Sequence, residues 1–290
     1  MKEFNSHDDE KRFNNAKQSI GALLLQLGKI TASDLEAIVS HQKETNLLFG
    51  SAALQLGLIT ESDINHAMAL QFDYPYLQRN QGNYSQALVA AYQPFCTQVD
   101  SLRRLRSQLM LEWFNARSKS LAVVSSNDEE GGDGLVANLA IVFSQMGQRT
   151  LLVDANLRSQ NLRNMFNISE KYGLSDILAG RAGLEVITKI EALNDLSILC
   201  SGSMAPNPQE LLNKHAFAMF MTKAVADYDI VLVNTAPAGL TADSQSVIAW
   251  CRGALLVSRL NFTHISSLAE VRDQIVQTGS TLVGAVINDF

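Results

Sequence analysis

The sequence predicts an α/β fold in which a doubly wound, mostly parallel sheet is preceded by a small all-α domain. Three observations support this prediction. A helical pattern repeats within the first eighty residues, short apolar runs alternate with helical patterns after residue 120, and a glycine-bearing loop separates the first of these runs from the next helix. A chain of 290 residues is also long enough for two domains.

An internal repeat defines the predicted N-terminal domain, residues 1–80. The segments Ser19–Gln42 and Leu48–Gln71 match at a constant offset of 29 residues. In each unit we expect a short helix to end at Gly28 or Gly57, and a Thr-x-Ser-Asp segment then provides the N-cap of a second helix. Two such units that bury their apolar stripes against each other form a small helical domain.

Residues 81–120 are predicted to be a linker followed by an amphipathic helix over 98–114. Asp100, Arg103 and Arg106 are spaced three residues apart, which places their charges on one face of that helix. This face is either solvated or able to contact acidic side chains of a neighbouring subunit.

The third part of the chain, residues 121–290, alternates candidate strands with helical patterns. Most of these strands are continuous apolar runs, as expected for a sheet covered on both faces, and doubly wound sheets bind their ligands at the carboxyl ends of the strands. The expected strands are Leu121–Ser125, Thr150–Asp154, Leu196–Cys200, Ile230–Asn234, Ala254–Ser258 and Leu282–Ile287.

The formal charge of −6 lies entirely in this third part. Residues 1–120 carry 12 basic and 12 acidic side chains, whereas residues 121–290 carry 11 basic and 17 acidic ones. Proteins that bind nucleic acids normally present a basic surface to the phosphates, so the acidic excess argues against a nucleic-acid partner.

The cysteines and the hydropathy indicate the compartment. Cys96, Cys200 and Cys251 are far apart and odd in number, which fits reduced thiols rather than a disulfide framework. The segment Met1–Asp9 is polar and acidic, and no apolar run approaches the roughly 18–20 residues that span a bilayer. We therefore expect a cytoplasmic protein that reaches the inner membrane face only through a partner.

A phosphate-binding loop is expected between the first strand and the next helix, within residues 125–134. In such loops the backbone amides and the helix N-terminus bind phosphate, a lysine neutralises it, and a Ser or Thr hydroxyl binds Mg²⁺. Here the lysine position is Gly132 and the Ser/Thr positions are Asp133 and Gly134, with the helix expected to open at about Leu135.

The same loop is strongly acidic, because Asp128, Glu129, Glu130 and Asp133 lie within six positions. A like charge about 4 Å from a phosphate costs up to about 4 kcal/mol at an effective dielectric constant near 20. A helix N-terminus contributes only about 0.3–2 kcal/mol. Polyphosphate binding is therefore unfavourable unless the acids themselves recruit Mg²⁺, and the alternative interpretation is an acidic, solvated turn.

Seven segments of the third part occur in an order that is typical of one family: the loop at 125–134, Val136–Ala140, Arg149–Arg158, Gly173–Gly180, Gly202–Leu212, Tyr228–Pro237 and Gly284–Asn288. On these segments, residues 121–290 resemble the cytoplasmic domain of bacterial polysaccharide-biosynthesis tyrosine autokinases, which are P-loop proteins related to the MinD/ParA ATPases. The chain also resembles exopolysaccharide chain-length determinant kinases of the EpsG type, in which a helical domain precedes the kinase domain.

The resemblance implies a P-loop-type kinase fold, an ATP-dependent protein-tyrosine kinase activity, and ATP and Mg²⁺ as cofactors. It assigns vestigial catalytic positions to Asp154 and Arg158. It also implies that the nucleotide site consists of Gly131, Gly132, Asp133, Gly134, Asn234, Asp243, Arg259 and Asn288.

The departures from the family pattern fall on residues that carry the chemistry. The second Asp of the family's second acidic motif is Asn156 here, and its Walker B Asp is Asn234. No tyrosine follows Tyr228, although the family carries a tyrosine cluster there for autophosphorylation. Magnesium in these sites depends on carboxylates and the loop hydroxyl, so these changes predict a pseudokinase with a degenerate ATP site and no assignable metal ligands.

Two further resemblances concern assembly. The spacing of Asp100, Arg103 and Arg106 is similar to the Glu-x-x-Arg-x-x-Arg segment through which these kinases self-associate into rings. The repeat at 19–71 resembles the MshEN-like module of type II secretion ATPases. In the members of that module that bind cyclic-di-GMP an Arg opens each motif, whereas Ser19 and Leu48 stand there in this chain.

The leading hypothesis is a non-catalytic regulator of exopolysaccharide chain length and export. Its expected partners are the membrane chain-length determinant (polysaccharide copolymerase) protein, further copies of itself, or a paralogous active kinase. Two alternatives stay open. One is an active tyrosine autokinase with a site rebuilt on Arg158, Asp154 and Asp243, and the other is a cyclic-di-GMP-responsive adaptor.

Overall fold

A computed structural model of the chain describes residues 19–72, 77, 82–115 and 118–289. The chain divides into two compact units, Met1–Gln78 and Arg79–Phe290. The polar segment Met1–Asp9 and the start of the expected linker, at 78–81, lie outside the described residues.

The smaller unit consists of two helix pairs that follow the sequence repeat. The helices are α2 (Ile20–Gln26), α3 (Ala32–Thr45), α4 (Phe49–Gln55) and α5 (Glu61–Gln71). The short first helix of each pair ends before a glycine with positive φ, Gly28 at 66° and Gly57 at 68°. The predicted helix, glycine, helix order of each repeat is thus confirmed.

Matching caps begin the long helices of both repeats. Thr31 accepts a hydrogen bond from the Asp34 amide and donates its own amide to the Asp34 carboxylate, and Thr60 and Asp63 repeat this arrangement. Lys29 of the first repeat forms an ion pair of 2.9 Å with Asp63 of the second. The apolar faces of the four helices meet in one core that includes Leu23, Leu24, Ile38, Ala52, Ala53 and Ala67.

The larger unit is built on a seven-stranded sheet with the order β3-β4-β2-β5-β1-β6-β7. All neighbouring strands are parallel except β3 and β4. The strands are β1 (Ser120–Ser125), β2 (Thr150–Asp154), β3 (Thr188–Lys189), β4 (Leu196–Leu199), β5 (Ile230–Asn234), β6 (Gly253–Arg259) and β7 (Thr281–Asn288). The predicted doubly wound α/β fold is confirmed, and each of the six expected strands is present.

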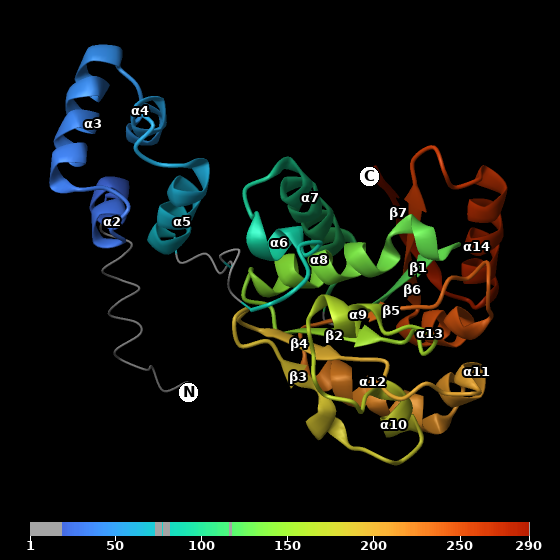
Figure 1. Ribbon diagram of the computed structural model, residues 1–290. Helices are drawn as coiled ribbons and strands as arrows, with labels where there is room; N and C mark the ends of the chain where they lie inside the picture. Colours follow the sequence, from blue (N-terminus) through green and yellow to red (C-terminus); the bar gives the residue numbers. More distant parts are fainter. Residues whose placement is uncertain (1–18, 73–76, 78–81, 116–117, 290) are drawn as a thin grey trace. The chain divides into compact units, whose positions relative to one another are not determined.

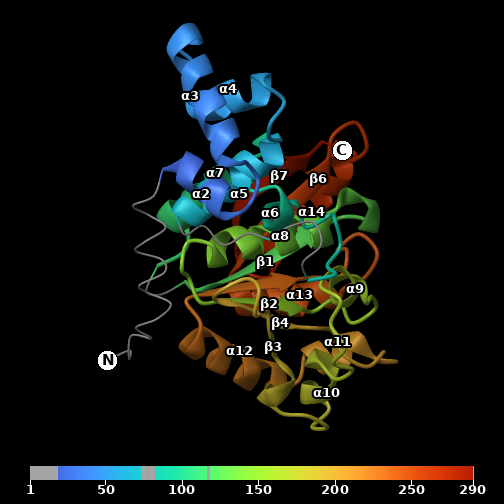
Figure 2. The same ribbon diagram turned by 60° about the vertical axis from the view of Figure 1, so that its left-hand side comes forward.

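Helices cover both faces of this sheet (Figures 1 and 2). Helices α7 (Thr97–Glu112) and α8 (Gly132–Ser144) lie on one face, and α12 (His215–Asp227), α13 (Asp243–Cys251) and α14 (Ile265–Gln277) lie on the other. Strands β1, β2 and β5 are buried along their whole length. Because both faces are covered, these strands are continuous apolar runs rather than alternating ones.

Short elements complete the unit at the sheet's periphery. They are the 3₁₀ turns η1 (Asp128–Glu130) and η2 (Leu184–Val186) and the helices α6 (Val89–Tyr92), α9 (Asn161–Met165), α10 (Leu174–Leu178) and α11 (Pro208–Leu212).

Two features add to the sequence expectations. The segment 81–120 belongs to the larger unit and contributes α6 and α7, which pack on α8, and α7 corresponds to the expected amphipathic helix. The Asn138 side chain of α8 binds the Ala90 amide at 2.9 Å and the Ala87 carbonyl at 2.9 Å, and so holds this segment. The other feature is β3, a two-residue strand too short to leave a pattern in the sequence.

Within the part of the chain that the structure describes, no helix combines the length and the apolar character needed to cross a bilayer.

The repeated caps predict matched stability effects. Thr60→Ala removes the acceptor of the Asp63 amide and should lower the local free energy of unfolding of α5 by about 1 kcal/mol, which is roughly a fivefold increase in amide hydrogen exchange. Thr31→Ala should have the same effect on α3. Hydrogen exchange of the full chain measures both, with Thr45→Ala at the other end of α3 as the control. Unchanged exchange in both variants would contradict the capping assignment.

Candidate functional site

The candidate site lies at the carboxyl ends of β1, β2, β5, β6 and β7, on the loop between β1 and α8. This loop forms the turn η1, passes through Gly131 at a φ of 77°, and enters α8 at Gly132. The helix therefore begins three residues earlier than the expected Leu135. The first amides of a helix have no acceptors within that helix, so the first turn of α8 presents donors to this edge of the sheet.

Glu130 lies inside the loop rather than at its surface. Its side chain is buried, and its carboxylate accepts hydrogen bonds from the Ser126 amide at 2.6 Å, the Ser126 hydroxyl at 2.6 Å and the Asn127 amide at 3.2 Å. The Thr263 hydroxyl, from the loop after β6, donates a fourth at 2.8 Å. A buried carboxylate with this many donors is compensated internally.

This geometry corrects the expectation that four acids of the loop together repel a phosphate. The Glu130 carboxylate is stabilised by hydrogen bonds from donors of its own loop. Asp128 and Glu129 are exposed, so water and salt screen their charges. Asp133 alone among the four contacts a side chain of β5, that of Asn234.

Asp133 belongs to a chain of polar side chains that crosses from α8 to β5 and β2. The Asn234 amide donates to Asp133 at 2.7 Å and to Asp154 at 3.1 Å, so one side chain bridges two carboxylates. The second oxygen of Asp133 accepts from the Asn161 amide at 2.7 Å. Asp154 also accepts from the backbone amide of Asn156 at 3.2 Å. The predicted residues Asp133, Asp154 and Asn234 are thus brought together.

Asp154 is fully buried at the end of β2. Burial raises the pKa of its carboxyl to about 8, and the negative charge of the nearby Asp133 acts in the same direction. The hydrogen bonds from Asn234 and Asn156 lower this pKa, but their effect is smaller than that of burial. At neutral pH this carboxyl is therefore largely protonated in the folded protein.

Arg158 and Asp243, both predicted for the site, form their own pair beside this chain of contacts. The Arg158 guanidinium donates to the two carboxylate oxygens of Asp243 at 2.6 and 3.3 Å. The Asp243 side chain is 3% exposed, whereas that of Arg158 is 49% exposed. The pair therefore fixes Arg158 at the rim of the site.

Arg259 and Asn288 contact the backbone of the loop. The Arg259 guanidinium donates to the Glu129 carbonyl at 3.3 Å and lies 5.4 Å from the centre of the Phe262 ring. The Asn288 side chain donates to the Glu130 carbonyl at 2.8 Å. Both residues reach the predicted site, and their described contacts hold the loop in place.

A cavity of about 940 Å³ opens beside the loop. It is bounded by Gly131, Gly134 and Asn138 of the loop and α8, by Asn288 at the end of β7, and by α7 with Arg104. The space next to the start of α8 is therefore open to a ligand or to a partner's side chain.

The three residues predicted for self-association make contacts within the chain. Asp100 and Arg103 form an ion pair of 2.8 Å on α7, and Arg106 donates to the Val142 carbonyl of α8 at 2.8 Å. Arg106 thus ties α7 to α8, and a role of this helix face between subunits stays a prediction.

Among the described residues, no three His, Cys, Asp or Glu side chains are grouped so as to hold a metal ion. Asp133 and Asp154 both accept hydrogen bonds from the Asn234 amide, which lies between the two carboxyl groups.

Three residues of the site were missed by sequence reasoning. Asn161 and Thr263 come from elements far from the loop in sequence, and only the fold brings them to it. The inward orientation of Glu130 had a local signal, the Asn127-x-x-Glu130 spacing, because a Glu three residues after a capping residue commonly returns to the backbone amides.

The chain is similar to bacterial tyrosine-protein kinases, although no protein-family model matches it. Tyrosine-protein kinase YwqD of Bacillus subtilis is 29% identical over 213 residues, which are 73% of this chain and 90% of that kinase. Tyrosine-protein kinase etk of Escherichia coli K12 is 27% identical over 200 residues, and the match covers 28% of that longer protein.

Solved structures agree with these relatives. The kinase domain of Escherichia coli tyrosine kinase ETK superposes with a TM-score of 0.69 at 27% identity, covering 73% of this chain and 82% of that domain. The cell division ATPase MinD of Pyrococcus furiosus matches with a TM-score of 0.52 at 23% identity, over 59% of this chain and 72% of MinD, which supports the P-loop fold alone. The relatives of this chain are bacterial tyrosine-protein kinases, and its structural neighbours include the kinase domain of one of them.

The buried Asp154 predicts a pH dependence of stability. Between the ordinary aspartate pKa and a folded-state pKa of about 8, the native carboxyl binds a proton that the unfolded chain has released, so the free energy of unfolding falls as the pH rises through this window. Asp154→Asn removes this contribution. The variant should lose less stability than the parent between pH 5 and pH 8, by an amount on the order of 1 kcal/mol per pH unit. Urea denaturation at several pH values measures the difference, and parallel curves for the two proteins would contradict it.

Proposed function

We propose that this chain is a non-catalytic relative of the polysaccharide-biosynthesis tyrosine kinases. It regulates exopolysaccharide chain length and export through protein contact, with a membrane polysaccharide copolymerase or with an active kinase copy. The observation that carries the proposal is the contact chain from Asp133 through Asn234 to Asp154. It occupies the positions at which the resembled kinases bind Mg²⁺ and the nucleotide phosphates.

The residues of this contact chain satisfy one another without a ligand. The Asn234 amide donates hydrogen bonds to both carboxyl groups, and the Asn161 amide donates to the second oxygen of Asp133. The lysine position is Gly132, so no cation of the loop faces a phosphate, while a carboxylate stands on the first turn of α8. Transfer of a phosphoryl group depends on cations at this place, which makes catalysis by these residues unfavourable.

Exposed apolar side chains surround the same edge of the sheet, which supports a role in protein contact. They lie after the carboxyl ends of β4, β5 and β6 and near the carboxyl end of β7, and Ile265, at 84% exposed, is the most exposed of them. The set is Met204, Leu240, Leu260, Phe262, Ile265 and Ile287. Large apolar side chains gathered on one edge are typical of a surface that a protein partner covers.

For residues 19–71 we propose a docking role rather than cyclic-di-GMP binding. The residues at the two positions where the resembled module carries Arg lack the chemistry to grip a nucleotide. The Ser19 hydroxyl caps α2 by accepting from the Ala22 amide at 3.3 Å, and the Leu48 side chain is apolar and 81% exposed. Arg stacks on bases and binds phosphate with two donors, which neither residue can replace.

Calorimetry with Mg²⁺-ATP tests the loss of nucleotide binding. The full chain should give no binding heat up to millimolar nucleotide. The triple variant Gly132→Lys, Asp133→Thr and Asn234→Asp restores the cation, the hydroxyl and the carboxylate. Its dissociation constant for Mg²⁺-ATP should be at least about a hundredfold lower than that of the unmodified chain. A side chain fits at Gly132, where a Cβ would lie 3.4 Å from its nearest neighbour.

The matched control replaces Gly132→Lys by Gly134→Lys in the triple variant. A Cβ at Gly134 would meet no neighbouring atom within 4 Å, so the same charge is accommodated but stands at the wrong position of the turn. Micromolar binding of Mg²⁺-ATP by the unmodified chain, abolished by Asp154→Ala, would overturn the proposal in favour of an active kinase with a rebuilt site.

Charge introduced into the apolar edge should abolish partner capture. Ile265→Glu and Leu240→Glu place carboxylates on exposed positions, so they should leave the melting temperature within about 2 °C while reducing co-purification of the membrane polysaccharide copolymerase at least about tenfold. Val276→Glu, exposed at the far end of α14, is the control and should retain the partner. Full capture by both edge variants would remove this edge from the proposal.

A further inference from the structure

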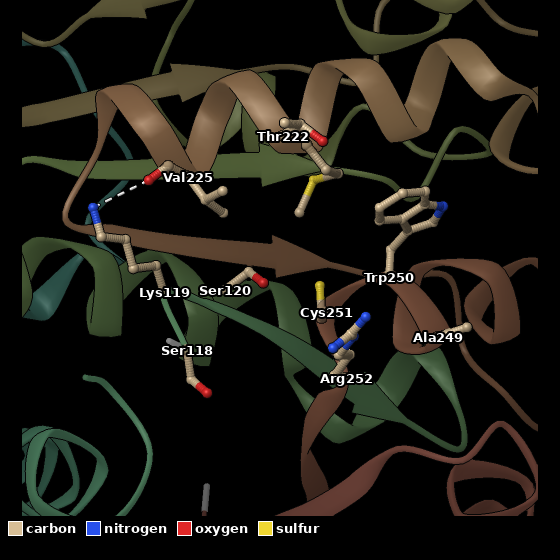
Figure 3. A pocket seen from close by; sticks show the side chains of 10 residues that line it. Ser118, Lys119, Ser120, Thr222, Val225, Ala249, Trp250, Cys251 and Arg252 are labelled. Atoms are coloured by element: carbon tan, nitrogen blue, oxygen red, sulfur yellow. Dashed lines mark hydrogen bonds between the residues drawn. The ribbon is translucent and has the colours of Figure 1, made fainter. Parts of the chain in front are cut away.

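A second cavity lies at the opposite edge of the same sheet, where β1 and β6 begin (Figure 3). Its volume is about 700 Å³, and it is lined by Ser118–Ser120, by α12, and by the end of α13 with the following Arg252. The residues of the candidate site all follow the carboxyl ends of the strands, so the two cavities share no lining residue.

The lining of this cavity carries positive charge only. Among the described residues that line it, Lys119, Arg252 and Cys251 are ionisable and none is a carboxylate. Burial raises the pKa of the Cys251 thiol to about 12, so this group stays neutral. The nearby Asp229 is already bound by two hydrogen bonds from the Arg149 guanidinium, at 2.8 and 3.1 Å.

Both cations retain donors for a ligand. The Lys119 ammonium donates to the carbonyls of Val225 at 3.1 Å and Tyr228 at 3.3 Å, which accounts for two of its three hydrogens. The Arg252 side chain is exposed and has no hydrogen bond or ion pair within the described residues.

The backbone does not explain why an arginine stands at position 252. Arg252 follows the last turn of α13 with a φ of 57°, the left-handed conformation that favours glycine or asparagine. A side chain kept at such a position points to a use for that side chain.

Trp250 supplies a flat apolar wall to the same cavity. Trp250 is 43% exposed, and Figure 3 shows Trp250 and Arg252 at one end of the cavity, whereas the Lys119 ammonium lies at the other end and is turned towards the Val225 carbonyl. An indole face stacks on other planar rings, while ammonium and guanidinium groups bind phosphate or carboxylate.

We propose that this cavity binds an anionic group carried on a flat ring, with the ring on Trp250 and the anion at the neighbouring Arg252, while Lys119 adds positive charge to the same cavity. The ligand class is an aryl phosphate or aryl carboxylate. A phosphorylated tyrosine of a protein segment and a free aryl phosphate share this chemistry. The site does not depend on the proposed function, because it uses none of the residues that would bind ATP.

Intrinsic fluorescence of the full chain provides the test, since the chain has only two tryptophans and Trp250 is the one that lines the cavity. Phenyl phosphate and N-acetyl-phosphotyrosine amide should quench the emission saturably. N-acetyl-tyrosine amide, which has the ring without the charge, and inorganic phosphate, which has the charge without the ring, should each bind at least about tenfold more weakly.

Arg252→Gly is the decisive variant. It removes the guanidinium and at the same time relaxes the left-handed backbone, so weakened binding cannot be ascribed to misfolding. Binding should weaken at least about tenfold in this variant and in Trp250→Ala. Because Trp250→Ala removes the fluorescent side chain, ligand binding by that variant is measured by calorimetry. Arg272→Gln, on an exposed arginine of α14 outside the cavity, should bind as the parent does.

The outcomes separate the sources of the ligand. Tighter binding of a phosphotyrosyl hexapeptide than of phenyl phosphate supports a protein segment as the ligand, and equal binding supports a free aryl anion. Absence of saturable quenching, or quenching that Arg252→Gly leaves unchanged, would overturn the proposal whatever the result with ATP.

Discussion

The buried carboxylate of Glu130 is the constraint on which the candidate site depends. It accepts from the amides of Ser126 and Asn127 in its own loop and from Thr263 in the loop after β6, so it joins the ends of two neighbouring strands. A buried charge is tolerated only while its hydrogen bonds are complete, which makes this arrangement rigid. Because the loop closes over Glu130, the chain leaves it at Gly131 with positive φ and begins α8 at Gly132. Because α8 begins at Gly132, Asp133 lies in the first turn of this helix.

This constraint also changes the meaning of the loop's acidic composition. From the sequence alone, four carboxylates in six positions form one repulsive cluster. In the fold they separate into an internal carboxylate, Glu130, two solvated ones, Asp128 and Glu129, and one that binds across the sheet, Asp133. The charge of a segment predicts its electrostatic effect only when the direction of each side chain is known, and sequence spacing gives that direction for a helix or a strand but rarely for a loop.

The same distinction explains which other features the sequence could predict. The strands of the sheet are buried on both faces and therefore leave apolar runs, and the helix pairs of 19–71 leave a repeat with capping residues such as Thr31 and Thr60. The four-residue helix α6 and the strand β3 are too short for a pattern. Their positions depend on tertiary contacts, such as the Asn138 side chain that holds the backbone at Ala90. Hydrogen-bond partners that are distant in sequence, such as Asn161 for Asp133, could not be predicted from the sequence for the same reason.

The residues at positions 133 and 234 depend on each other, and this dependence bears on whether a cation belongs in the site. Asn234 donates to both Asp133 and Asp154. An aspartate at 234 would remove the amide that donates to Asp133 and Asp154 and would place a third carboxyl group beside them, an arrangement that a bound cation stabilises. The amide makes the cluster stable without a cation, and protonation of Asp154, whose pKa burial raises to about 8, removes further charge. Restoring the acid at 234 alone would therefore destabilise the fold, and a cation-binding site requires the hydroxyl at 133 to return with it.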